Sequence, residues 1–240
     1  MPTLEASSKS VYVQQMFTSI APKYDLLNHL LSLNIDRLWR KRAVKLSAVK
    51  ADAQVLDVCC GTGDFSFEFA KALGPQGHVT GTDFVTPMIE IFRKKIQRRG
   101  LGQKIVAKFA DALKLPFGDQ HFDVVSVAFG VRNLADYRLG LSEFYRVLRP
   151  GGKLVILEFN DANSPIFGPL FKAYFNHILP RVGRFISNDR TGAYLYLPAS
   201  VKGFPRASDF LSLMQTSGFN PVQAHPMTLG IVTCFLGIKP

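Results

Sequence analysis

The chain has few of the residues that build covalent or metal-held structure. Among 240 residues there are three cysteines and five histidines, and two of the cysteines are the neighbours Cys59 and Cys60. Three cysteines leave no even set for a disulfide framework, and neither residue type recurs at the spacing of a zinc site. The sequence therefore predicts no metal centre, and we expect the paired cysteines to be small packing residues at a strand end.

Long apolar runs are also missing, although 47% of the residues are hydrophobic. Charged residues interrupt each run before the length of about 20 that a bilayer-spanning helix needs. The polar residues 1–9 contain no secretory h-region. We therefore expect a cytoplasmic protein, with residues 1–240 forming a single domain, because this length suits one hydrophobic core.

Acidic residues are scarce, with 18 against 29 basic residues and a formal net charge of +11. The excess is concentrated in two groups, Arg37, Arg40, Lys41, Arg42, Lys45 and Lys50, and then Arg93, Lys94, Lys95, Arg98 and Arg99. Such groups are typical of solvated helix faces, of proteins attracted to anionic membranes and of nucleic-acid-binding proteins. Charge alone does not choose among these three interpretations.

Apolar runs separated by turn residues predict an α/β fold with a doubly wound parallel sheet. Strands are expected over 54–59, 78–83, 105–110, 122–128 and 153–159, and helices over 64–73, 86–99 and 136–148. A helical segment over 10–48 precedes this alternation, and a helix over 206–217 with strands over 219–226 and 230–238 follows it. The short connection between the last two strands favours an antiparallel hairpin that closes the sheet.

The turn after the first predicted strand is the most informative motif. Residues 55–64 read Val-Leu-Asp-Val-Cys-Cys-Gly-Thr-Gly-Asp, so an apolar strand leads through Gly61 and Gly63 into a helix. The backbone can approach a ligand closely at such a turn, and Asp83 at the end of the next strand can bind a ribose diol. These residues predict a site for a nucleoside cofactor.

The nucleoside is either a dinucleotide or S-adenosylmethionine (SAM). The dinucleotide fingerprint requires a glycine or alanine at the third position, which is Ser66 here. Asp57 lies inside the strand, where its carboxylate would face the charged amino-acid end of SAM, or waters around it, rather than a pyrophosphate. A Pro-Gly-Gly turn after Arg149 ends a helix and begins the fifth strand.

This pattern resembles class I SAM-dependent methyltransferases. The resemblance implies a Rossmann-like sheet of seven strands, of which the last is antiparallel. It also implies that an N-terminal helical cap over 1–50 and an insertion over 160–204 cover the carboxyl ends of the strands, where ligands bind.

More specific stretches resemble the ubiquinone/menaquinone biosynthesis C-methyltransferase family. They are residues 23–32 with 37–39, residues 129–133, residues 146–153 with 158–159, and residues 179–183, and the resemblance runs from about residue 11 onward. It implies methyl transfer from SAM to a ring carbon of a prenylated quinol, either demethylmenaquinol, which residues 58–62 and 81–84 favour, or a methoxy-benzoquinol. The chain departs from the family pattern at Leu27, Asp36, Ala128 and Asn160, where Met, His, Ser and Ser are usual. Ala128 removes a hydroxyl near the cofactor, and Asp36 changes the charge.

The resemblance also implies which residues bind the cofactor. Its SAM contacts fall on Thr62, Asp83, Asp111 and Ala112, beside Asp57 and the two glycines, Gly61 and Gly63. Asp83 would accept both ribose hydroxyls, and Asp111 would accept the adenine amine while the amide of Ala112 serves a ring nitrogen. The alternative for Asp111 is a cap on the following turn.

Four residues near the expected active-site mouth are candidates for the chemistry. The quinol carbon becomes a good nucleophile only when a ring hydroxyl loses its proton, directly to a base or through water. Arg132 would stabilise the phenolate or position a water, and Asn133 would orient the ring oxygen. Tyr24 would be a hydrogen-bond partner, and Asp25 would be the proton acceptor if either residue lies near the ring. The alternatives are a turn cap for Arg132 and Asn133 and a helix start for Tyr24 and Asp25.

A prenylated quinol resides in the bilayer, so the resemblance implies transient binding to the inner face of a membrane. Apolar residues in the insertion recur at helical spacing, and they are Phe167, Leu170, Phe171, Tyr174, Phe175 and Ile178. They would line a tunnel, rest on lipid or form an ordinary amphipathic helix. The oligomeric state stays open, with a homodimer among the possibilities, and no nucleic-acid partner is expected.

Two other functions remain open at the level of sequence. An RNA or protein methyltransferase would use the positive charge to hold an acidic substrate. Against it, the fourth strand ends in Phe-Gly-Val-Arg-Asn and lacks the Pro-Pro-aromatic turn typical of amino-group methylation. A scaffold with the same fold but no catalysis is the second alternative, and the intact Asp57, Gly61, Gly63 and Asp83 argue against it.

Overall fold

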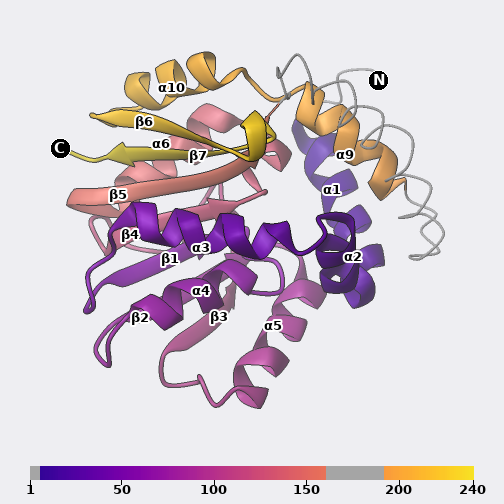
Figure 1. Ribbon diagram of the computed structural model, residues 1–240, viewed down its shortest axis with the longest axis horizontal. Helices are drawn as coiled ribbons and strands as arrows, with labels where there is room; N and C mark the ends of the chain where they lie inside the picture. The colour runs from indigo at the N-terminus through magenta and orange to yellow at the C-terminus, as the bar shows by residue number, and fades with distance from the viewer. Residues whose placement is uncertain (1–5, 161–191) are drawn as a thin grey trace.

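A computed structural model describes residues 6–160 and 192–240 and shows a seven-stranded sheet between layers of helices (Figure 1). The strands are β1 (Gln54–Val58), β2 (His78–Asp83), β3 (Ile105–Phe109), β4 (Phe122–Ala128), β5 (Leu148–Phe159), β6 (Val222–Met227) and β7 (Val232–Ile238). Their order is β3-β2-β1-β4-β5-β7-β6, and β7 runs antiparallel to both of its neighbours. The predicted fold class, including the reversed last strand, is confirmed.

Helices cover both faces and one end of this sheet. They are α1 (Ala6–Ile20), α2 (Tyr24–Leu31), α3 (Ile35–Ser47), α4 (Asp64–Ala72), α5 (Thr86–Arg98), α6 (Tyr137–Val147), α9 (Ala193–Lys202) and α10 (Ala207–Thr216). Buried side chains of α3, α4 and α5 form one apolar core with the sheet, and those of α6 and α10 form a second core. The two cores place α3, α4 and α5 on one face and α6 and α10 on the other.

The remaining helices, α1, α2 and α9, gather at the end of the sheet where β1 and β4 finish (Figure 1). They have an apolar cluster of their own, which includes Val13, Met16, Leu27, Tyr196 and Val201. Because the carboxyl ends of the parallel strands point toward this cluster, a ligand at those ends is enclosed by helices.

The helical segment expected over 10–48 is divided into three helices. A 3-10 turn, η1 (Ala21–Lys23), contains Pro22 and separates α1 from α2. Leu33 and Asn34 both have positive φ, 53° and 60°, and they separate α2 from α3. Positive φ interrupts a right-handed helix, so α2 and α3 meet at a sharp corner.

The predicted boundaries of the other elements agree with the structure to within about three residues, except at β5. The expected start was residue 153, whereas β5 begins at Leu148. Phe122 pairs with Leu148 before the register shifts, and Val124 pairs with Lys153. The Pro-Gly-Gly turn is therefore an irregularity within a pairing that begins five residues earlier than predicted.

Residues 161–191 lie outside the described part of the chain, and the apolar residues expected to line a tunnel, Phe167 to Ile178, are among them. Among residues 6–160 and 192–240, no helix is both long enough and apolar enough to span a bilayer.

Candidate functional site

The loop between β1 and α4 requires its two glycines. Gly61 has φ +53° and Gly63 has φ +92°, a backbone region that side chains rarely adopt. A Cβ on Gly63 would lie 2.0 Å from Cε2 of Phe92, which is fully buried. The sequence at Gly63 therefore lets α4 begin close to α5, and Gly61 presents bare backbone to the ligand side.

Asp83, at the end of β2, has its carboxylate fixed by backbone amides. Oδ2 accepts the N–H of Gly61 at 2.9 Å, Oδ1 accepts the N–H of Val85 at 2.9 Å, and the amide of Phe84 also contributes. Burial raises the pKa of this carboxyl to about 6, and the amide hydrogen bonds oppose that rise. A carboxylate has about four lone-pair sites, so Asp83 keeps acceptor capacity for a ligand.

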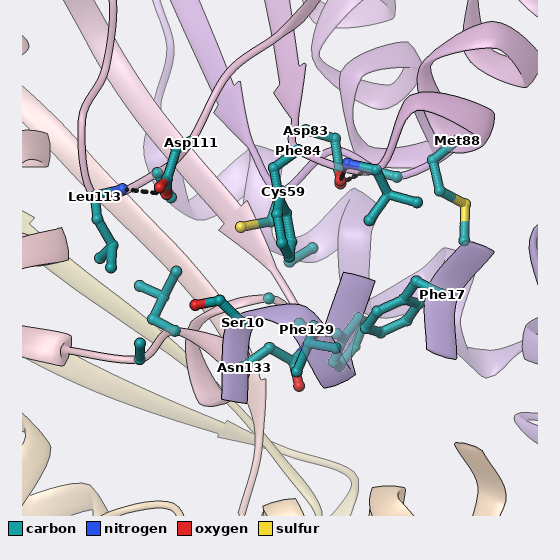
Figure 2. Close-up of a pocket in the computed structure, with 18 of the residues that line it drawn as sticks. Ser10, Phe17, Cys59, Asp83, Phe84, Met88, Asp111, Leu113, Phe129 and Asn133 are labelled. Carbon is teal, nitrogen blue, oxygen red and sulfur yellow. Dashed lines mark hydrogen bonds between the residues drawn. The ribbon is translucent and has the colours of Figure 1, made fainter. Parts of the chain in front are cut away.

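A first cavity, which we call the cofactor cavity, opens beside Asp83 (Figure 2). Asp83, Phe84 and Asp111 lie on one side of it, and Phe17 and Asn133 lie on the other. The cavity also contains backbone of Gly61 and the buried side chain of Ala112.

Asp111 caps the turn that follows it, as the alternative from sequence anticipated. Its Oδ1 accepts the N–H of Leu113 at 2.9 Å. Within the described part of the chain no residue bonds to Oδ2, and the side chain still lines the cofactor cavity. The two roles weighed for Asp111, cap and ligand contact, are therefore compatible.

Asp57 is completely buried between two hydroxyl groups. Ser66 donates to Oδ2 at 2.6 Å, and Ser126 of the neighbouring strand β4 donates to Oδ1 at 2.9 Å. Burial raises the pKa of Asp57 to about 6, partly offset by these hydrogen bonds. The carboxylate borders a small third cavity together with Arg40, Thr62 and Asp64.

A second cavity of about 290 Å³ adjoins the cofactor cavity, and we call it the acceptor cavity. Most of its wall is apolar, and the contributing side chains include Met16, Ile20, Leu31, Trp39, Phe159 and Ile231. Trp39 anchors α3 here, because its Nε1 donates to Thr228 at 2.7 Å. Phe17, Tyr24 and Phe129 belong to the walls of both cavities.

Arg132 lies in the acceptor-cavity wall, in the 3-10 turn η2 (Val131–Asn133) after β4. Its Nη1 lies 2.8 Å from Oε1 of Glu158, which is fully buried, and its backbone N–H donates to Oε2 at 3.2 Å. Nη1 also donates to the carbonyl of Phe129, and Nε donates to Ser200 at 3.2 Å. No residue of the described chain accepts from Nη2. The guanidinium is thus held rigidly with donors left for a ligand.

Tyr196 is a second polar group in the acceptor cavity, and the sequence motifs did not single it out as a site residue. Its side chain is buried, and its hydroxyl has no hydrogen-bond partner among the described residues. Burial raises the pKa of this hydroxyl, and the nearby positive charge of Arg132 opposes the rise. A buried hydroxyl without a partner is costly, so a ligand oxygen in the cavity would satisfy it.

Tyr24 and Asn133, two of the predicted catalytic residues, occupy different places. Tyr24 borders all three cavities, and its pKa is raised by burial, so the hydroxyl is protonated at neutral pH. Asn133 lines the cofactor cavity only, with a buried Oδ1 that no described residue satisfies. Asn133 therefore lies in the wall of the cofactor cavity and not in that of the acceptor cavity.

Asp25 lines neither the cofactor cavity nor the acceptor cavity. One oxygen accepts a hydrogen bond from the hydroxyl of Thr62, and the other lies 2.6 Å from Nζ of Lys95. Lys95 also donates to Thr62 at 3.0 Å and pairs with Asp64 at 3.2 Å. Asp25 and Thr62 thus tie α2 and the glycine loop to α5, and the geometry gives Asp25 no contact with an acceptor.

Asp36 and Arg40 form a buried pair beside the acceptor cavity. Asp36 accepts from Ser32 at 2.7 Å, from His29 Nδ1 at 3.0 Å and from Nη1 of Arg40. His29 Nε2 lies 3.5 Å from Asp64. The departure from the family pattern at residue 36 is therefore matched by a neighbouring arginine on the same helix.

Arg40 and Lys95 correct one expectation drawn from composition. Both were counted with the basic groups that a solvated helix face would explain, yet Arg40 is 7% exposed and the Lys95 side chain is 18% exposed. Each is paired with a carboxylate of another turn or helix. The partners of Lys95 lie on α2 and α4, and only the packing of these helices brings them together. Arg40 pairs with Asp36 one turn earlier on its own helix, and it is buried because α3 packs against the rest of the protein.

The cofactor cavity fits SAM on the evidence of its own residues. A buried carboxylate fixed by backbone amides faces the cavity at Asp83, a second carboxylate lines it at Asp111, and bare backbone lines it at Gly61. These are groups suited to a ribose diol, an adenine amine and a closely approaching ligand. Fold and site together define a class I SAM-dependent methyltransferase, as expected from the sequence.

Comparison with known proteins places this chain in a family. The model of the ubiE/COQ5 methyltransferase family matches residues 5–239, and the chain belongs to that family. It is 44% identical over 238 residues to a demethylmenaquinone methyltransferase of Deinococcus radiodurans, covering 99% of this chain and 97% of the relative. It is 45% identical over 225 residues to a protein of the same name from Thermus thermophilus, covering 94% and 100%.

A solved structure shares the fold at low sequence identity. The crystal structure of a SAM-dependent methyltransferase from Aquifex aeolicus aligns with a TM-score of 0.62 and 16% identity, covering 84% of this chain and 89% of that one. The family expected from the sequence motifs is thus confirmed, together with SAM as its methyl donor.

Proposed function

We propose that the chain transfers a methyl group from SAM to a ring carbon of demethylmenaquinol, giving menaquinol, with its site residues in the roles below. The observation that carries this proposal is the contact between the two cavities. Phe17, Tyr24 and Phe129 line both cavities, so a donor in one and a flat acceptor in the other are direct neighbours. An apolar acceptor cavity suits an aromatic head group and the start of a prenyl tail.

The cofactor cavity assigns separate tasks to its residues. Asp83 would accept the ribose hydroxyls, Asp111 the adenine amine, and Ala112 would leave room for the ring, with Gly61 and Gly63 keeping the backbone close. Thr62 and Asp57 support this loop from behind through their hydrogen bonds. SAM supplies a methyl group on a sulfonium centre, which any electron-rich carbon held in line can accept.

The acceptor needs its ring as a phenolate, and two residues in the wall favour that form. The fixed guanidinium of Arg132 stabilises negative charge on the oxygen, and the Tyr196 hydroxyl, which has no partner among residues 6–160 and 192–240, donates to it. Tyr24, protonated at neutral pH, offers a further donor at the boundary of the cavities. Asn133, in the wall of the cofactor cavity, would help to orient the ring oxygen from that side.

The proton leaves to water rather than to a carboxylate of this wall. Asp36 is the one carboxylate among the described residues lining the acceptor cavity, and it accepts three hydrogen bonds, one of them from Arg40. Its oxygens are therefore already engaged by Ser32, His29 and Arg40. Asp25 is engaged by Lys95 and Thr62 and lines neither the cofactor cavity nor the acceptor cavity. A positive charge at Arg132 lowers the pKa of the quinol hydroxyl, which makes water a sufficient acceptor.

We further propose that the enzyme works transiently on the cytoplasmic face of a membrane. Leu33 and Leu229 are 75% and 59% exposed, and both have positive φ, so each is displayed at the top of a turn. Leu33 and the neighbour of Leu229, Thr228, line the acceptor cavity. Exposed basic residues follow on α3, namely Arg37, Lys41, Arg42 and Lys45. Apolar tips beside basic charge suit an anionic lipid surface.

The test is methyl transfer from labelled SAM to reduced demethylmenaquinol, in parallel with the demethylated methoxy-benzoquinol of the ubiquinone pathway. The oxidised quinones serve as controls, because they have no hydroxyl to deprotonate. We expect product from demethylmenaquinol and none from either quinone. Binding of SAM without product on either quinol would contradict the proposal and return attention to an RNA or protein substrate, or to a scaffold.

A further inference from the structure

The third cavity is lined by a buried cation to which the proposed function assigns no role. It is Arg40 of α3, whose side chain is 8% exposed. Of its five N–H groups, one is hydrogen-bonded within the described part of the chain, from Nη1 to Asp36. The guanidinium carbon lies 5.6 Å from the centre of the Phe129 ring. Desolvating a guanidinium is costly unless a partner satisfies it.

This third cavity continues the cofactor cavity past the glycine loop. The two share Tyr24, Cys59 and Ala128, and the third adds Arg40, Asp57 and Asp64 to the wall. A ligand whose ribose binds Asp83 and whose adenine binds Asp111 extends its opposite end past Gly61. That opposite end therefore lies in the third cavity.

The charges of the third cavity have both signs. Asp57 and Asp64 supply carboxylates, and Arg40 is the one cation among the described residues that line it. Arg40 also acts at a distance on both carboxyls and on Tyr24, where its positive charge lowers the pKa. An α-amino acid group is a zwitterion, so its ammonium suits the carboxylates and its carboxylate suits a guanidinium.

We propose that Arg40 binds the α-carboxylate of the methionine portion of SAM. The proposal rests on the proposed function, because it assumes the orientation set by Asp83 and Asp111. Arg40 would then contact three parts of the site. It lies over the ring of Phe129 in the wall shared by the two large cavities, and it bonds to Asp36 near the corner between α2 and α3. Its remaining N–H groups would donate to the carboxylate of the cofactor.

The experiment compares two ligands that differ only at the amino-acid end. S-adenosylhomocysteine retains the α-carboxylate, whereas 5′-methylthioadenosine lacks the amino-acid portion and keeps adenosine. Calorimetry measures both affinities for the full chain and for Arg40→Met, which preserves side-chain length without charge. We expect the affinity for S-adenosylhomocysteine to fall roughly 10- to 100-fold, the value of a hydrogen-bonded charge, and that for methylthioadenosine to change less than about threefold.

Three further variants make the outcome decisive. Arg37→Met removes an exposed arginine one turn away and leaves both affinities unchanged. Arg40→Lys keeps the charge and retains most of the affinity for S-adenosylhomocysteine. Arg40→Met alone leaves the buried charge of Asp36 without its arginine and can destabilise the protein. Arg40→Met with Asp36→Asn removes both charges of the pair and avoids this cost.

Equal losses for the two ligands would show that Arg40 only supports the fold, and would overturn the proposal. Unchanged affinity for S-adenosylhomocysteine in the double variant would also overturn it. If the unaltered chain bound neither ligand, the assignment of the cofactor cavity itself would fail, which separates that failure from a failure at Arg40.

Discussion

Nη1 of Arg132 lies 2.8 Å from Oε1 of Glu158, and the Glu158 side chain has no exposure to solvent. This pair joins the turn after β4 to the end of β5 and fixes the one guanidinium that we place against the acceptor oxygen. Removing a single member of a buried pair typically costs about 3–5 kcal/mol of stability, because the other charge is left without a partner. A test of Arg132 must therefore separate chemistry from folding.

Replacing Arg132 by alanine will lower turnover by at least about 100-fold, the usual effect of removing one donor to a developing oxyanion. Affinity for SAM will stay within a few-fold, because Arg132 lies in the acceptor cavity. The control is Arg132→Gln with Glu158→Gln, which removes both charges and spares the fold. Single-turnover rates of both variants measure the chemical step, and denaturant unfolding measures their stability. Full turnover in the double variant would remove Arg132 from the mechanism.

Replacing Tyr196 by phenylalanine will reduce kcat/KM by about 10- to 100-fold, because a hydrogen bond to a charged oxygen is worth about 1.5–3 kcal/mol. Stability will not fall, since the hydroxyl has no partner among the described residues. Steady-state kinetics with a short-chain quinol measure kcat/KM, and thermal unfolding measures the stability. Tyr145→Phe is the matched control, because that ring packs on Phe219, away from the cavities. A Tyr196 variant as active as the control would contradict the assigned role.

Affinity for S-adenosylhomocysteine will fall as the pH drops through about 6, the value to which burial raises the pKa of Asp83. Below that pH the carboxyl binds a proton and loses acceptor capacity for the ribose. Asp83→Asn will bind more weakly at pH 7.5 and will depend less steeply on pH. Asp57, with a pKa also near 6, accounts for the remainder. Calorimetry between pH 5 and 8 measures this, and an unchanged slope in the variant would refute the role of Asp83.

The same two carboxyls affect stability with the opposite sign. Their native pKa values, about 6, exceed the ordinary value of 3.8, so between these pH values the native state binds more protons than the unfolded state. The free energy of unfolding therefore decreases as pH rises from about 4 to about 6 through these groups. The residues that favour ligand binding at neutral pH are destabilising there without the ligand.

Replacing Gly63 by alanine will lower the free energy of unfolding by about 3 kcal/mol or more, since overpacking and a positive φ both oppose the new side chain. The added Cβ would lie 2.0 Å from Phe92. Gly100→Ala is the control, because Gly100 has φ +63° and no atom within 4 Å of its new Cβ. That variant will lose only about 1 kcal/mol from strain. Equal losses in denaturant unfolding would mean that the contact with Phe92 does not matter.

Replacing Leu33 and Leu229 together by serine will weaken binding to vesicles that contain anionic lipid. Both side chains are exposed, and Leu33 and the neighbouring Thr228 line the acceptor cavity. Burying one leucine is worth about 1.5–3 kcal/mol. Leu139→Ser, an exposed leucine of α6, will bind as the unaltered chain does. Sedimentation with vesicles at low and high salt measures the effect, and salt will weaken binding through the basic face of α3. Equal binding by all variants would exclude this surface.

The fold was predictable where the signal is local. The strands, the glycine turn and Asp83 follow from residues within one βαβ unit, because apolar runs and turn residues alone determine them. The start of β5 was misplaced, since the pairing of Leu148 with Phe122 is a contact between strands and leaves no mark on either segment.

The site was predictable only in part, because several of its contacts join distant segments. Asp25 and Lys95 are 70 positions apart, and no motif in the sequence around either residue predicts that they form an ion pair. From the sequence, Arg40 was grouped with the basic residues of a helix face, and Tyr196 fell in the predicted insertion without a site role. Burial distinguishes both of them, and burial depends on how α3 and α9 pack over the ends of the strands.

The ring of Phe129 belongs to the walls of both large cavities, and Arg40 lies over it. A residue that lines both cavities can couple them, and such coupling is reciprocal: if the methyl donor orders Phe129 for the acceptor, the acceptor raises the affinity for the donor by the same factor. Such coupling favours the loaded ternary complex over either half-filled state. The reactive sulfonium would then spend little of each cycle facing water without its partner.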